Sequence, residues 1–180
     1  MEQVEQAVLS MLRPNTVLDL LANFTSYATH KGKQRIKLIA RYQQVDGANK
    51  IVQRVVAGKT RKGLIWHFQG SGKSLLMLFA SRKLRMHPTL KNPTVLVVVD
   101  RIDLDSQISG TFYAADMPNM VRSESRNELK DLLEKDVRKV VVTTIHKFAE
   151  TYGVLNNRDN IIVMVDEAHR TQEGDLGRRM

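Results

Sequence analysis

The chain has 180 residues, 42% hydrophobic and 26% charged, and its 28 Lys+Arg against 19 Asp+Glu give a formal net charge of +9. This composition is that of a globular domain and excludes a disordered tail, and no apolar stretch is long enough to span a bilayer. Because the sequence has no cysteine, disulfide scaffolds, thiolate metal sites and cysteine nucleophiles are excluded.

The first elements in chain order are predicted to be helical. Asn15 or Thr16 can cap a helix over 17–24, whose apolar residues recur at helical spacing. A polar loop is expected over 29–35, followed by a second helix over about 43–57 that ends at Gly58.

The pattern then changes to strands alternating with helices. Apolar runs at 63–68, 94–99, 140–145 and 161–165 predict strands, the last three with the β-branched composition of strands covered on both faces. Helices are expected after residue 74 and over 126–135. The alternation predicts an α/β fold with a doubly wound, mostly parallel sheet. Trp66, in the middle of a predicted strand, is expected in the core, and the alternative is that it stacks on a base.

The positive charge is concentrated in the first half of the chain. Residues 1–90 carry 15 basic and 4 acidic side chains, whereas residues 91–180 carry 13 basic and 15 acidic ones. Residues 31–62 alone hold ten basic residues against Asp46. This segment is either a phosphate-facing strip, whose binding would depend on salt, or a solvated helix surface.

A glycine-rich loop lies between the predicted strand at 63–68 and the next helix. Glycines turn backbone N–H groups inward, and a helix start attracts anions. A lysine can then bind the β- and γ-phosphates, and a hydroxyl can bind Mg²⁺. The predicted phosphate-binding residues are Gly70, Ser71, Gly72, Lys73 and Ser74. His67 replaces the first glycine of the general P-loop pattern, and the alternative is a glycine-rich turn with an exposed lysine.

A pair of carboxylates follows the last predicted strand. Asp166 can hold Mg²⁺, and Glu167 can act as the general base for an attacking water. His169 is expected to couple the site to other elements and not to bind metal, since no second histidine lies at ligand spacing. The alternative is an acidic cap on the following helix.

Together these motifs resemble superfamily 2 helicases and translocases, and more closely the R subunit of type I restriction enzymes. The resemblance covers about residues 38–175 and lies in four strings: ARYQQ (40–44), GLIWHFQGSGKS (63–74), VDRIDLDSQ (99–107) and VDEAHR (165–170). It implies a RecA-like, ATP-binding motor lobe over 38–180, incomplete at its C-terminal end, behind a helical extension at 1–37. A histidine at the position of His67 is usual in that family.

The resemblance also implies roles for single residues. Gln44 would read adenine, since a carboxamide can donate and accept; the alternative is a solvent-facing helix glutamine. Arg101, Thr143 and Thr144 match motifs that contact DNA, although Arg101 could equally form a local ion pair and the threonines could simply end a strand. Glu128 and Lys130 match the E-x-K of a nuclease, but a predicted amphipathic helix makes them surface residues.

For the whole protein, the resemblance implies ATP and Mg²⁺ as cofactors and hydrolysis that drives translocation of double-stranded DNA. Cleavage would come from a nuclease domain outside this chain, and arginine fingers from a second lobe. The methyltransferase and specificity subunits would be partners, in the cytoplasm of a bacterium or an archaeon. The alternatives are a non-catalytic module that binds nucleotide or DNA, and a lobe of another DNA or RNA helicase.

Overall fold

The centre of the fold is a parallel sheet of four strands in the order β4-β5-β3-β6. In this computed structural model, residues 5, 8–9, 12–29, 35–68, 70–99, 102–115, 117–149 and 156–166 are described. The sheet strands are β3 (Thr94–Val99), β4 (Met120–Arg122), β5 (Val140–Thr144) and β6 (Ile161–Val165). In register, Val97 of β3 lies opposite Val142 of β5 and Met164 of β6.

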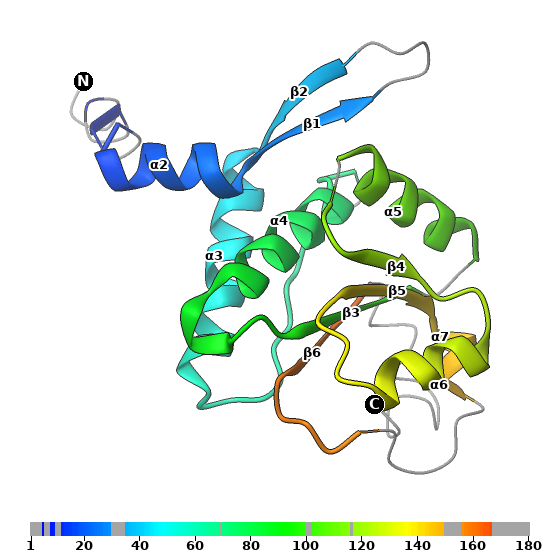
Figure 1. Ribbon diagram of the computed structural model, residues 1–180. Helices are drawn as coiled ribbons and strands as arrows, with labels where there is room; N and C mark the ends of the chain where they lie inside the picture. Colours follow the sequence, from blue (N-terminus) through cyan, green and yellow to red (C-terminus); the bar gives the residue numbers. More distant parts are fainter. Residues whose placement is uncertain are drawn as a thin grey trace.

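Helices cover both faces of this sheet (Figure 1). Alternate residues of β3 enter two separate apolar clusters: Val95, Val97 and Val99 lie in the cluster that includes α4, whereas Leu96 and Val98 lie in the one that includes α6. The helices are α3 (Tyr42–Ala57), α4 (Lys73–Met86), α5 (Ile102–Ala114), α6 (Arg126–Glu134) and α7 (Ile145–Ala149), with the short 3-10 helix η1 (Pro88–Leu90) before β3. The predicted doubly wound α/β fold is therefore confirmed.

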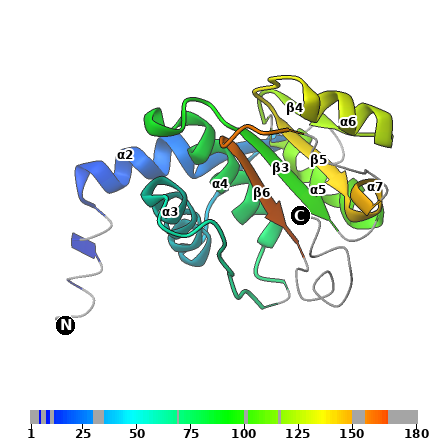
Figure 2. The same ribbon diagram turned by 90° about the horizontal axis from the view of Figure 1, so that it is seen from below.

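The strands differ in how completely they are covered. Every residue of β3 and β5 is buried, as expected for strands with helices on both faces. By contrast β6 lies at the sheet edge (Figure 2), and Val163 is 44% exposed. The expectation that 161–165 is covered on both faces was therefore wrong in this structure.

The predicted strand at 63–68 is not formed. This segment has no regular secondary structure, and Leu64 and Trp66 are 73% and 89% exposed. The predictions of a strand there and of Trp66 in the core were wrong, because an apolar run becomes a strand only where a neighbouring strand satisfies its backbone hydrogen bonds. Among the described strands, none pairs with 63–68.

The N-terminal part contains a helix and a hairpin. The helix α2 (Pro14–Asn23) starts earlier than predicted, with Pro14 in its first turn, so that Asn15 and Thr16 lie inside the helix and do not cap it. The strands β1 (Thr25–Thr29) and β2 (Arg35–Ile39) pair antiparallel and replace both ends of the predicted loop at 29–35. Figure 1 shows this hairpin projecting away from the sheet and its helices.

The extension shares the core of the sheet. Phe24, fully buried between α2 and β1, packs on Phe79 of α4 with ring centroids 5.7 Å apart. The domain boundary between residues 37 and 38 stays a prediction. Within the described residues, no helix has the length and apolar character needed to cross a membrane.

Candidate phosphate-binding site

The loop before α4 has the backbone of an anion-binding turn. Gly70 and Gly72 have φ angles of 80° and 84°, a region that side chains other than glycine rarely adopt. Gly72 is the N-terminal cap of α4, and Lys73 and Ser74 form its first turn. The first N–H groups of a helix have no partner within the helix and carry its positive dipole end. The predicted loop residues therefore lie where an anion is bound favourably.

A buried glutamine joins α3 to this loop. Gln44 is only 2% exposed, and its Nε2 group donates to the carbonyl oxygens of Ser71 at 3.4 Å and Gly72 at 3.2 Å. Its Oε1 accepts from the backbone N–H of Arg41 at 2.8 Å. The alternative of a solvent-facing glutamine was wrong. Adenine recognition stays a prediction, and it requires the carboxamide to exchange a loop contact for the base.

The contact with Gln44 depends on the absence of a side chain at Gly72. A Cβ built at Gly72 would lie 2.3 Å from Nε2 of Gln44, well inside contact distance. A second glycine, Gly47 in α3, was not singled out from the sequence; its added Cβ would lie 3.0 Å from Leu76 and 3.4 Å from Nε2 of His67. A glycine inside a predicted helix was the available signal, because that position is costly unless packing needs it.

His67 contacts the loop from its other end. Its Nδ1 lies 3.3 Å from Oγ of Ser71, which is 5% exposed. The backbone N–H of Ser71 also donates to the carbonyl of Phe68 at 3.3 Å. His67 therefore supports the loop through a side chain, at the position where a general P-loop has glycine.

Asp166 directly follows β6 and is partly buried. Its backbone N–H donates to the carbonyl of Val98 at 2.9 Å and so continues the pairing of β6 with β3. In parallel α/β sheets, the carboxyl ends of strands are where ligands bind. Glu167 and His169, the predicted base and coupling residue, lie outside the described residues.

The donors available for Mg²⁺ are a hydroxyl and a carboxylate. Ser74 in the first turn of α4 and Asp166 after β6 are both partly buried oxygen donors. The described residues contain no group of three or more His, Cys, Asp or Glu side chains that could hold a metal alone. This fits Mg²⁺, which is commonly held by one or two protein oxygens together with substrate phosphates.

The predicted DNA-contacting residues are placed differently. Thr143 and Thr144 end β5 and are 0% and 2% exposed, and Oγ1 of Thr143 has no hydrogen-bond partner among the described residues. Neither hydroxyl reaches the surface in this structure, so their contact with DNA stays a prediction. Arg101 lies outside the described residues.

The E-x-K string belongs to the surface of α6, as predicted. The N–H of Glu128 donates to Oγ of Ser125, and its carboxylate accepts from the N–H of Glu124 at 2.8 Å. Lys130 lies 3.6 Å from Glu134 one turn later. Ser125 therefore caps the start of α6, and Glu128 adds a hydrogen bond to the residue before the cap.

The chain is similar to known proteins over most of its length. Residues 43–180 match the SWI2/SNF2 ATPase family. The type I restriction enzyme HindI endonuclease subunit of Haemophilus influenzae is 39% identical over 96% of the chain and 18% of its own length. A second relative, described as the putative type I restriction enzyme MjaIXP endonuclease subunit of Methanocaldococcus jannaschii, is 36% identical over 80% of the chain and 15% of its own length. The chain thus spans less than a fifth of either relative.

Proposed function

The chain belongs to the SWI2/SNF2 ATPase family, and we propose that it is the ATP-binding part of the motor in the R subunit of a type I restriction enzyme. Residues 70–74 would hold the phosphates, and the complete protein would use ATP hydrolysis to translocate double-stranded DNA. The observation that carries the proposal is the pair of glycines at positive φ directly before Lys73 and Ser74 at the start of α4. This arrangement suits a phosphate because N–H groups and positive dipole converge there.

The roles of the site residues follow from their chemistry. Lys73 would place its ammonium on the β- and γ-phosphates, while the N–H groups of the loop bind the remaining oxygens. Ser74 and Asp166 would hold Mg²⁺, which neutralises phosphate charge when bound. Glu167 would accept a proton from the attacking water.

We also propose the wider assembly from the relatives. Their names describe endonuclease subunits of type I restriction enzymes, so the complete protein would act on duplex DNA with methyltransferase and specificity subunits. Cleavage would come from a nuclease domain outside this chain, in the cytoplasm of a bacterium or an archaeon.

A second candidate function is a binding module without turnover. The chain covers 18% or less of these two relatives, and NTP hydrolysis gains large factors from arginine fingers that another part of such a motor supplies. In this reading the chain binds nucleotide or DNA and releases no phosphate.

Phosphate release from ATP, measured with and without duplex DNA, separates the two functions. The motor is supported if DNA stimulates turnover and Glu167→Gln abolishes it. Glu134→Gln, on the surface of α6, is the matched control and should keep that turnover. Nucleotide binding without phosphate release supports the module. A chain that binds neither ATP nor DNA and releases no phosphate contradicts both.

A further inference from the structure

The β1–β2 hairpin has two chemically different faces. Directly paired residues of an antiparallel ribbon share a face, and Tyr27 pairs with Lys37 while Thr25 pairs with Ile39. Tyr27, Arg35, Lys37 and Ile39 are all exposed, whereas Ser26 and Ala28, on the opposite face, are 5% and 8% exposed. We call Tyr27, Arg35 and Lys37 the outer face of the hairpin.

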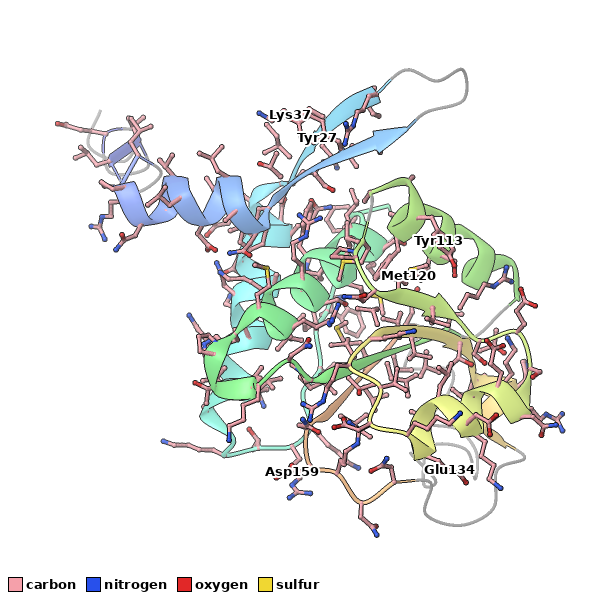
Figure 3. All side chains as sticks on the ribbon, in the orientation of Figure 1. Tyr27, Lys37, Tyr113, Met120, Glu134 and Asp159 are labelled. Carbon is pink, nitrogen blue, oxygen red and sulfur yellow. The ribbon has the colours of Figure 1, made fainter. Side chains whose placement is uncertain are left out.

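Polar contacts on the inner side hold the hairpin to the body. Oγ of Ser26 donates to the carbonyl of Ala115 at 2.9 Å, at the end of α5. The guanidinium of Arg82 in α4 donates to the carbonyl of Thr25 at 2.9 Å and to Oγ of Ser26 at 3.2 Å. These contacts fix the orientation of the hairpin, so the outer face is held away from the body, where Figure 3 shows Tyr27 and Lys37.

The charge of this region has one sign. Between Asp19 and Asp46 the sequence contains no acidic residue. The basic residues of α3 make contacts within the chain: Lys50 pairs with Asp46 at 2.7 Å, and Arg54 donates to Thr60 and to the carbonyl of Lys62. The outer face therefore carries exposed positive charge on an element that is hydrogen-bonded to the body of the fold.

The arrangement of Arg35 and Tyr27 favours a phosphate backbone over an unstacked base. The Cζ atom of Arg35 lies 5.1 Å from the centre of the Tyr27 ring, a cation–π distance. The guanidinium therefore covers one face of the ring that a base would stack on, and the ring in turn orders the guanidinium. A planar, ordered guanidinium suits bidentate phosphate contact.

We propose that the outer face of the β1–β2 hairpin binds the phosphate backbone of duplex DNA. Arg35 and Lys37 are two residues apart, or about 7 Å along a strand, a separation that lets two long basic side chains reach neighbouring phosphates of one DNA strand. Each basic residue then contacts its own phosphate. The inference rests on the proposed function only in taking DNA as the polyanion, since the hairpin and the loop at 70–74 are separate elements.

The test is the salt dependence of DNA binding by the full chain. A short labelled duplex is titrated by fluorescence anisotropy between about 50 and 200 mM salt, where each phosphate contact contributes about 0.9 to the slope of log K against log salt. The double variant Arg35→Gln/Lys37→Gln should lower the slope by about 1.8, making the loss of affinity over this range roughly tenfold smaller. Arg35→Lys/Lys37→Arg, which keeps both charges, should retain most of the slope.

The matched control removes two charges from the opposite face of the sheet. Lys130→Gln/Lys135→Gln, on α6 and its C-terminal cap, should leave the slope unchanged. An unchanged slope in the hairpin variant, an equal fall in the α6 variant, or no DNA binding by the parent chain would overturn the proposal. ATP binding is measured on the same samples, so that failure of the hairpin is distinguished from failure of the nucleotide site.

Discussion

The phosphate loop and the β1–β2 hairpin both lie outside the parallel sheet and are both held by polar hydrogen bonds, but they differ in how much of each is exposed. The loop is fixed by the buried carboxamide of Gln44, which hydrogen-bonds its carbonyl groups. Gln44 packs so closely on Gly72 that a side chain at position 72 would collide with it. The hairpin is anchored on one face through Ser26 and Arg82 and presents the other to solvent. Buried polar contacts are costly to break, whereas exposed charges contribute little to stability and act mainly on association.

The largest effect is expected at Gly72. Gly72→Ala forces a Cβ toward Nε2 of Gln44 at a φ of 84°, so both backbone strain and a lost buried hydrogen bond contribute, together about 2–5 kcal/mol of unfolding free energy. Urea unfolding of the parent and the variant measures this loss of unfolding free energy. Gly70→Ala is the control, because its φ of 80° is similar but its added Cβ meets nothing within 4 Å. Equal losses in the two variants would contradict the role of Gln44.

Gln44 itself comes next. Gln44→Ala leaves the N–H of Arg41 and the loop carbonyls without this partner, which should lower the unfolding free energy by about 1–3 kcal/mol and weaken nucleotide binding. The adjacent exposed Gln43→Ala should change stability by less than about 0.5 kcal/mol. A Gln44 variant as stable as the Gln43 variant would show that the hydrogen bonds of Gln44 do not hold the loop.

The hairpin anchor should give a smaller and more local effect. Arg82→Met removes two hydrogen bonds to β1, which we expect to cost about 1–2 kcal/mol. Amide hydrogen exchange should quicken in β1 and β2, while α3 and β3 keep their protection. The exposed Arg61→Met serves as control. Uniformly faster exchange would mean that Arg82 stabilises the whole lobe.

An exposed ion cluster outside both regions should give the smallest effect, visible only at low pH. A hydrogen bond from Arg138, and then the charges of Arg138 and Arg158, hold the pKa of Asp136 below its usual 3.8. A lowered carboxyl pKa stabilises the fold above the unfolded value, and this contribution disappears as pH falls through the folded value.

Melting temperatures between about pH 5 and pH 3 should therefore fall more in the parent than in Asp136→Asn. Asp159→Asn, at another exposed aspartate, is the control and should follow the parent. If Asp136→Asn also follows the parent over this pH range, the cluster makes no contribution.

The sequence predicts an element well where its partners are close or its pattern is strong. The run at 94–99 became the buried strand β3, and the helix at 43–57 ends as expected, at Gly58 with φ 63°. The run at 63–68 is also largely apolar but stays irregular, because strand formation depends on a paired neighbour as well as on composition. The alternation of Arg35-Ile36-Lys37-Leu38 could have indicated β2, although its partner β1 has no comparable signal.

The candidate site was predictable in part for the same reason. The loop residues 70–74 form one contiguous motif, so their position before a helix follows from local sequence. The contact between Gln44 and Gly72 joins residues 28 apart, and only the packing of α3 against α4 brings them together. Neither residue type, taken alone, indicates that contact.

The central claim is that residues 70–74 bind the phosphates of ATP, and isothermal titration with ATP–Mg²⁺ tests it most directly. The parent chain should release binding heat, and Lys73→Ala should lose it, because the ammonium that contacts the β- and γ-phosphates is gone. Lys130→Ala, on the exposed surface of α6, should bind as the parent does. Equal heat from the parent and Lys73→Ala would contradict the account.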